Sequence, residues 1–187
     1  IRGSVVALAP GDTGGPQLPA SVREAGSVAD GGAERVHSVL NCLRQLLKVG
    51  QPDDWVLVHD AARPCLRRAD LDRLLIQAGA HPVGGILAVP VRDTMKRARE
   101  SGDIAATVER HNLWHALTPQ MFRLGALEQA LAAAVAAGAM VTDEAQAMEL
   151  AGTPGLLVQG HADNIKVTLT DDLAIAELFL SRLEGQA

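Results

Sequence analysis

The strongest constraint on the fold is an alternation along the chain, in which short runs of Val, Ile and Leu are separated by longer segments of helical period. Several of the short runs are apolar throughout, as expected of strands that are buried on both faces. Strands that alternate with helices in this way predict an α/β fold, a parallel sheet covered by helices. The predicted strands are Val5–Leu8, Ser27–Asp30, Trp55–His59, Gly85–Val91, Leu156–Gln159 and Ile165–Thr168.

Between these runs, apolar residues recur at the spacing of amphipathic helices. The stripes from Val36 to Leu47 and from Leu71 to Ala78 predict the first two helices. An alanine-rich stretch from Leu124 to Ala137 predicts a third, which Gly138 ends. A fourth helix is marked by Leu173, Ala176, Leu180 and Leu183.

The charged region 92–115 breaks the alternation. Its strand-like pieces, Asp93–Arg97 and Ala106–Arg110, flank the turn-forming sequence Ser101-Gly102-Asp103. We therefore expect a hairpin that projects from a single domain spanning residues 1–187. Its surface is either solvated or in contact with a partner subunit.

Composition narrows the class of protein. With 187 residues, 48% of them hydrophobic and 21% charged, the chain suits one globular domain. The formal net charge of -5 disfavours nonspecific binding to nucleic acid or to a membrane surface. Two cysteines, Cys42 and Cys65, are too few for a disulfide framework, and no run is long enough to span a membrane. No leader sequence is recognised, and we expect a cytoplasmic protein.

The glycines after the first predicted strand look at first like a phosphate-binding loop. Such a loop needs a helix directly after it, but Pro16 and Pro19 prevent one. It commonly adds a cation, yet there is no Lys or Arg between Gly3 and Arg23. We interpret this stretch as a strand followed by a surface turn.

Polar residues at the carboxyl ends of strands are better candidates for a binding site. In VHDAARP, Asp60 can bind a divalent cation that bridges nucleotide phosphates, and Arg63 can contact the anion. Equally, Asp60 can cap the following turn and Arg63 can be solvated. We interpret His59 as a hydrogen-bonded structural residue rather than a metal ligand.

Three further segments carry polar groups that can contact a ligand. PVRDTMKRA places Thr94 among cations, and DNIKVT places Lys166 in an apolar pattern, either on an exposed edge or aimed into a cleft. In DGGAERVHSV, two glycines lie between a strand and a helix, where backbone can approach a base or ribose and Ser38 offers a hydroxyl. Each pattern alone is a weak signal.

Taken together and in order, VHDAARPCL, GGILAVPVRDTMKRA, LWHALTPQMF, TDEAQAMEL and ADNIKVT resemble the 2-C-methyl-D-erythritol 4-phosphate cytidylyltransferase family. The resemblance implies a Rossmann-like fold with a projecting arm, residues 92–115, that interlocks two subunits of a homodimer. It implies transfer of CMP from CTP to 2-C-methyl-D-erythritol 4-phosphate, which gives 4-diphosphocytidyl-2-C-methyl-D-erythritol and pyrophosphate. It also implies magnesium as the cofactor.

The resemblance further implies roles for single residues. Asp60 matches the acidic residue near the magnesium and the substrate, with Arg63 beside it. Arg110 and Lys166 match residues that grip the acceptor phosphate, and Thr94 and Thr118 match further acceptor contacts, with Thr94 and Arg110 serving across the dimer. The positions that match cytidine contacts are Gly32, Ser38 and Ala61. Where the family often has an acidic residue after the two glycines, this chain has Ala33.

The family's first strand, its glycine-rich loop and the basic pair after it are not in this sequence. We expect either that these residues precede Ile1 in the whole protein or that the chain is a truncated form, which would be nearly inactive by itself. Two alternatives remain open at this point. One is a cytidylyltransferase for another polyol phosphate, such as ribitol 5-phosphate, and the other is a noncatalytic dimeric module that binds a sugar phosphate.

Overall fold

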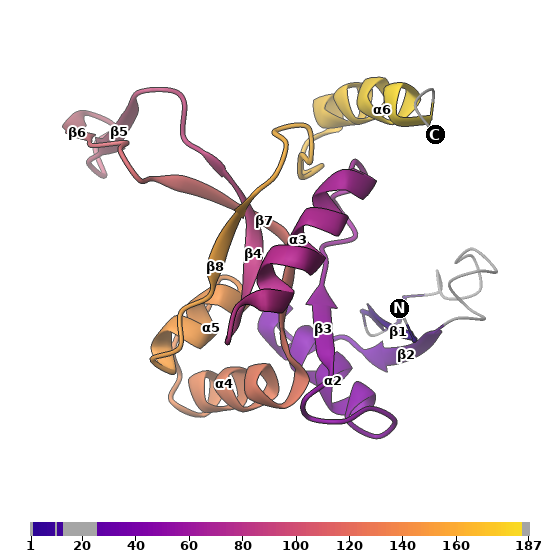
Figure 1. Cartoon of the computed structure of the whole chain (residues 1–187). Helices are drawn as coiled ribbons and strands as arrows, with labels where there is room; N and C mark the ends of the chain where they lie inside the picture. Colours follow the sequence, from indigo (N-terminus) through magenta and orange to yellow (C-terminus); the bar gives the residue numbers. More distant parts are fainter. Residues whose placement is uncertain (1, 10, 13–25, 185–187) are drawn as a thin grey trace.

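The computed structural model describes residues 2–9, 11–12 and 26–184, and its elements have the predicted α/β arrangement (Figure 1). Most of the opening turn, residues 13–25, lies outside the described residues. In chain order the elements are β1 (Ser4–Leu8), β2 (Gly26–Asp30), α2 (Arg35–Leu46), β3 (Trp55–Val58), α3 (Arg68–Ala80), β4 (Gly84–Pro90), β5 (Met95–Ala98), β6 (Ile104–Val108), β7 (Trp114–Arg123), α4 (Leu124–Ala136), α5 (Glu144–Leu150), β8 (Leu156–Gln159) and α6 (Thr170–Glu184).

The central sheet has four strands in the order β3-β7-β4-β8. β3, β4 and β8 run in one direction, and β7 runs antiparallel to both of its neighbours. A second, two-stranded sheet pairs β1 with β2 in parallel. The carboxyl ends of β3, β4 and β8 therefore lie along the same edge of the central sheet, where ligands of α/β proteins bind.

β7 is the one strand of this sheet that the sequence analysis did not predict. Its sequence contains Pro119, which usually argues against a central strand. The pairing of β7 with β4 shifts register between Ile86 and Ala88, and residues 117–119 lie in that irregular stretch. A local break in a ladder turns side chains away from the regular pleat, and here it accommodates the proline.

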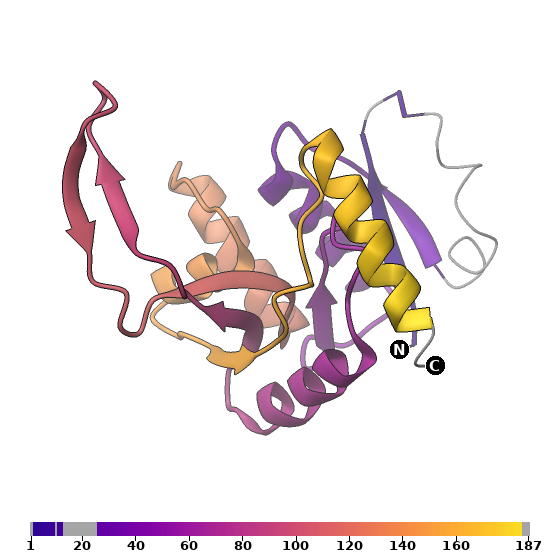
Figure 2. The ribbon, with the colours of Figure 1, turned by 90° about the horizontal axis from the view of Figure 1, so that it is seen from above.

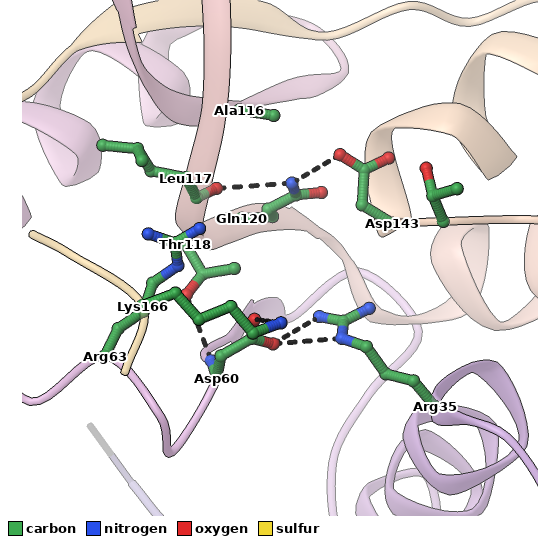
Figure 3. Close-up of a pocket in the computed structure, with 10 residues that line it drawn as sticks. Arg35, Asp60, Arg63, Ala116, Leu117, Thr118, Gln120, Asp143 and Lys166 are labelled. Carbon is green, nitrogen blue, oxygen red and sulfur yellow. Dashed lines mark hydrogen bonds and ion pairs between the residues drawn. The ribbon is translucent and has the colours of Figure 1, made fainter. Parts of the chain in front are cut away.

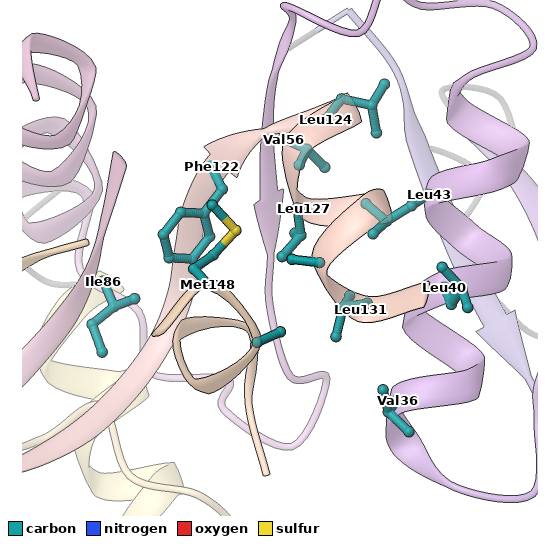
Figure 4. Packing of buried hydrophobic residues seen from close by; sticks show 12 residues of the cluster. Val36, Leu40, Leu43, Val56, Ile86, Phe122, Leu124, Leu127, Leu131 and Met148 are labelled. Atoms are coloured by element: carbon teal, nitrogen blue, oxygen red, sulfur yellow. The ribbon is translucent and has the colours of Figure 1, made fainter. Parts of the chain in front are cut away.

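The core lies on both faces of the central sheet. On one face, Leu40 of α2, Leu127 of α4, Met148 of α5 and Phe122 of β7 belong to one buried cluster, in which Met148 lies beside Phe122 (Figure 4). On the other face, α3 packs against the neighbouring Met121, Leu87 and Val158. Because adjacent strand residues point to opposite faces, the pair Met121 and Phe122 serves both halves of the core.

The four predicted helices are all present, and the one predicted end, at Gly138, is found. The third helix, α4, ends where Gly138 adopts a φ of 65°. Its neighbour Ala139 donates its N–H to the carbonyl of Ala134, which satisfies a carbonyl of the last turn.

The predicted hairpin is also present as β5 and β6, which pair antiparallel and project from the body of the protein (Figure 2). Gly102, with a φ of 87°, makes the turn at the predicted place. β6 is almost wholly exposed, and the Ile104 side chain at its start is 65% accessible. We call residues 92–115 the arm.

The predicted strand Ile165–Thr168 is wrong, because residues 160–169 form a loop between β8 and α6. Its backbone bonds go to other segments: Val167 donates its N–H to the carbonyl of Ala62, and Thr168 donates its N–H to the carboxylate of Asp172. The sequence analysis also missed the short helix α5, which Asp143 caps by accepting the N–H of Gln146. Among the described helices, none combines the length and the hydropathy that a membrane crossing needs.

Candidate active site

A hollow of about 180 Å³ opens at the edge of the sheet where β3 ends (Figure 3). Its walls come from the loop after β3, the irregular stretch of β7, the starts of α2 and α5, and the loop after β8. The residues that line it are Arg35, Asp60, Arg63, Ala116, Leu117, Thr118, Gln120, Thr142, Asp143 and Lys166.

Asp60 is the charged centre of this hollow. Its Oδ2 lies 2.9 Å from Nζ of Lys166, and its Oδ1 lies 3.0 Å from Nε and 2.9 Å from Nη2 of Arg35. Burial alone would raise the pKa of the Asp60 carboxyl, but the contacts with Lys166 and Arg35 outweigh it and lower the pKa. Asp60 is therefore an ionised carboxylate held between two cations.

Arg35 connects Asp60 to a second, buried carboxylate. Its Nη1 and Nη2 donate to the two oxygens of Glu144 at 2.7 and 3.0 Å. The side chain of Glu144 is 1% exposed, and that of Arg35 is 33% exposed. Burial raises the pKa of Glu144, an effect that Arg35 offsets in part. Burial would lower the pKa of Arg35, but Glu144 and Asp60 raise it, so the guanidinium stays charged.

A hydrogen-bonded chain fixes the backbone at Asp60. The N–H of Asp60 donates to Oγ1 of Thr118 at 3.1 Å. The Thr118 hydroxyl in turn donates to Nδ1 of His59 at 2.9 Å. The Nε2–H of His59 then donates to the carbonyl of Arg63 at 3.0 Å. Burial lowers the pKa of His59. This confirms the interpretation of His59 as a structural residue, here as a neutral imidazole.

The wall opposite Asp60 depends on Gln120, which is buried in β7. Its Nε2 donates to Oδ2 of Asp143 at 3.0 Å, and its Oε1 accepts the N–H of Ala145 at 2.8 Å. Gln120 thus ties the start of α5 to the central sheet. That start carries Thr142 and Asp143 into the hollow and brings Glu144 to Arg35.

Four of the predicted site residues meet in the hollow: Asp60, Arg63, Thr118 and Lys166. Gly32 and Ser38 do not line it and lie at the entry to α2, where the N–H of Gly32 donates to the Ser38 hydroxyl at 2.9 Å. Ala61 is exposed in the turn that follows Asp60.

Thr94 and Arg110, by contrast, do not line this hollow. Both are exposed on the arm, and Arg110 donates from Nη1 to the carbonyl of Arg92. Within one chain the arm projects away from the rest of the protein (Figure 2).

Comparisons with known proteins identify the family of this chain. Residues 2–182 match the family model described as 2-C-methyl-D-erythritol 4-phosphate cytidylyltransferase. The enzyme of that name from Pseudomonas aeruginosa is 56% identical over 174 residues, which cover 92% of this chain and 74% of that protein. The enzyme of that name from Vibrio parahaemolyticus is 51% identical over 181 residues, 97% of this chain and 77% of that protein. The chain belongs to this cytidylyltransferase family.

Solved structures agree with the same assignment. A crystal structure of 4-diphosphocytidyl-2C-methyl-D-erythritol synthase matches with a TM-score of 0.85 and 46% identity, covering 94% of this chain and 81% of that one. The cytidylyltransferase from Thermus thermophilus matches with a TM-score of 0.79 and 33% identity, covering 95% of this chain and 81% of that one. The α/β fold expected from the family resemblance is thereby confirmed.

Most of the pocket of this cytidylyltransferase family member was not predicted from the sequence. Arg35, Gln120, Thr142 and Asp143 line the pocket and were not picked out, and neither was Glu144, which pairs with Arg35. One local signal was available, since Asp143 followed three residues later by Gln146 is a helix-capping pattern and predicts the start of α5. The pairing of Glu144 with Arg35 has no sequence signal, because 109 positions separate them.

Proposed function

We propose that the hollow around Asp60 is where this member of the family transfers CMP from CTP to 2-C-methyl-D-erythritol 4-phosphate, giving 4-diphosphocytidyl-2-C-methyl-D-erythritol and pyrophosphate. One observation carries the proposal: a single carboxylate at the carboxyl end of β3 is surrounded by three cationic side chains from separate segments, Arg35, Arg63 and Lys166. Such a site is suited to phosphate groups accompanied by a metal ion.

The reaction joins two anions, so the main task of the protein is to offset their repulsion. An oxygen of the acceptor phosphate forms a bond to the α-phosphorus of CTP, and the bond from that phosphorus to the oxygen of the β-phosphate breaks. Pyrophosphate leaves, and no proton transfer is needed. Cations held in position before the reaction stabilise the charge that develops on the α-phosphate oxygens.

Lys166 is suited to the acceptor phosphate. Its side chain is 43% exposed, and its ammonium group contacts Asp60 and has three N–H donors in all. Arg63 donates from Nη1 to a backbone carbonyl and also lines the hollow. Thr118 has one lone pair left on Oγ1 after its bonds to Asp60 and His59. We assign that lone pair to a hydroxyl group of the acceptor substrate, which would donate to it.

The donor set is compatible with Mg²⁺ as the metal that accompanies CTP. The described residues contain no group of three His, Cys, Asp or Glu side chains arranged around a metal site. Mg²⁺ typically takes one or two carboxylates and completes its shell with substrate phosphates and water. Asp60 would supply the carboxylate, and the metal would neutralise the triphosphate.

The cytidine is assigned to the entry of α2. A Cβ on Gly32 would come within 2.2 Å of Cβ of His37, so only glycine fits there. Backbone at such a position can approach a base closely. We propose that Gly32, Ser38 and Ala61 contact the nucleoside.

The remaining acceptor contacts, Thr94 and Arg110, are assigned to the arm of a second copy of the chain. β4 leads into the arm from the sheet edge at which Asp60 lies, and β6 exposes Ile104 instead of burying it. In a two-fold dimer each arm can then reach the hollow of the other copy. Cys42 and Cys65 are both free thiols, which suits the cytoplasm as the working compartment.

The test is a comparison of acceptors with CTP and Mg²⁺ present. Methylerythritol phosphate should yield the cytidyl diphosphate product, and ribitol 5-phosphate should not. Lys166→Ala should raise KM for methylerythritol phosphate by about ten- to a hundredfold, the value of one charged hydrogen bond, and change KM for CTP little. Equal losses for both substrates would contradict the role of Lys166, and a preference for ribitol 5-phosphate would contradict the choice of acceptor.

A further inference from the structure

The loop that carries Lys166 has no regular secondary structure, yet it places an ammonium group 2.9 Å from Asp60. Residues 160–169 contribute neither a strand to the sheet nor a turn to a helix before α6 begins at Thr170. A lysine on an unrestrained loop would have to be ordered on each binding event, at a cost in entropy. Some other contact must therefore fix this loop.

Asn164 makes that contact. Its side chain is 1% exposed, and its Nδ2 donates to the carbonyl of Thr118 at 2.8 Å. The main-chain carbonyl of Asn164 accepts a hydrogen bond from Nη1 of Arg63 at 2.7 Å. Asn164, two positions before Lys166, is thus hydrogen-bonded to Thr118 and to Arg63, which both line the hollow.

Other contacts hold the loop at its start and along its length. At its start, Gly160 donates its N–H to the carbonyl of Ala88 in β4, and His161 donates its N–H to the carboxylate of Asp70 in α3. Asp163 is paired with Arg67, and Val167 donates its N–H to the carbonyl of Ala62 at 2.8 Å. Ala62 and Arg67 both belong to the segment between β3 and α3. Two of these contacts reach the central sheet, and the bond from Asn164 to Thr118 is the one nearer to Lys166, two positions away in the chain instead of six.

The amide of Asn164 is not the choice that packing alone would favour. Its Oδ1 is buried and has no hydrogen-bond partner among the described residues. An unpaired buried oxygen costs free energy, which an apolar side chain of similar size would avoid. The bond that the amide makes to β7 gives a reason for an asparagine at this position.

We propose that Asn164 is a positioning residue for Lys166, whose loop it anchors to Thr118 of β7 so that Nζ stays beside Asp60 and faces the acceptor phosphate. This inference rests on the acceptor role given to Lys166 under Proposed function. Asn164 itself touches no substrate.

The test is Asn164→Ala, compared with Lys166→Ala and with two core variants that lower stability elsewhere. Leu131→Val and Leu131→Ala remove buried carbon from α4, which lies away from the loop (Figure 1), and bracket the loss of stability. Asn164→Ala should raise KM for methylerythritol phosphate about tenfold and leave KM for CTP within about twofold. Hydrogen exchange should be faster at the amide of Val167 and unchanged at Phe122.

The outcomes separate the two proposals. If Asn164→Ala shows the kinetics of the Leu131 variants at equal melting temperature, the positioning role is wrong. If Lys166→Ala leaves KM for methylerythritol phosphate unchanged, the proposed function of the site is wrong. If Asn164→Ala does not fold, Asn164→Ser keeps a shorter donor, and its KM for methylerythritol phosphate should lie between those of the wild type and Lys166→Ala. A wild-type KM in Asn164→Ser together with faster exchange at Val167 would also refute the positioning role.

Discussion

The buried pair of Arg35 and Glu144 predicts an unequal response to removing its two members. Arg35→Met keeps the length and packing of the side chain but leaves the carboxylate of Glu144, 1% exposed, without its two donors. A buried charge that loses its partner costs about 3–5 kcal/mol of the free energy of unfolding. Glu144→Gln leaves Arg35, which is 33% exposed and still contacts Asp60, so we expect a loss of only about 1 kcal/mol.

The double variant Arg35→Met/Glu144→Gln should be more stable than Arg35→Met alone, because it no longer buries an unpaired charge. Burial raises the pKa of Glu144 and Arg35 offsets part of that rise, so the pKa should be raised further in Arg35→Met. A carboxyl whose folded pKa lies above its unfolded value contributes stability at low pH, and that contribution is lost as the pH rises through the folded value. The defect of Arg35→Met should thus be smallest near pH 4 and largest at pH 7.

Urea unfolding followed by circular dichroism measures these differences. Arg44→Met is the matched control, since it breaks a more exposed pair with Glu128 and should cost less than about 1 kcal/mol. A double variant no more stable than Arg35→Met, or a defect that does not change with pH, would refute the reasoning.

Two further predictions concern Asp60 and Gly32. Lys166 and Arg35 lower the pKa of Asp60, so its ionised form stabilises the fold at neutral pH, and this contribution is lost as the pH falls below about 4 through the lowered folded value. The wild type should therefore have a larger free energy of unfolding than Asp60→Asn at pH 7, and the two should become nearly equal near pH 2. A difference that stays constant with pH would contradict the ion pairing. Gly32→Ala should weaken CTP binding at least about tenfold in calorimetry, because the added Cβ would displace His37. Gly79→Ala is the control and should bind CTP normally, because its added Cβ would meet its nearest neighbour at 3.8 Å.

The fold was largely predictable because its signals are local. The apolar stripes at helical spacing gave α2, α3, α4 and α6, and the turn at Gly102 gave the arm. β7 was missed because Pro119 interrupts its pattern, and its backbone is tolerated only at a break in the ladder. The features that were predicted are set by residues close together in the chain, whereas the break in β7 depends on its pairing with β4.

The wrong strand at Ile165–Thr168 has a specific physical cause. The alternation is real, since Ile165 and Val167 are less exposed than Lys166 and Thr168. The segment lies extended against another loop instead of a strand, so Val167 finds one carbonyl, that of Ala62, and no ladder forms. Side-chain periodicity reports which face is covered, and it does not report whether the neighbour is a strand.

The meeting of Asp60 and Lys166 could not be read from the sheet either. Asp60 follows β3 and Lys166 follows β8, which lie at opposite ends of the order β3-β7-β4-β8. Three strand spacings separate those ends by about 14 Å, yet Nζ and Oδ2 are 2.9 Å apart. The loop after β8 must therefore cross back over the ends of β4 and β7, and the site exists only if that crossing is held in place. Asn164 binds the loop to Thr118 in the middle of this path, which is why we expect its loss to affect the acceptor more than the nucleotide.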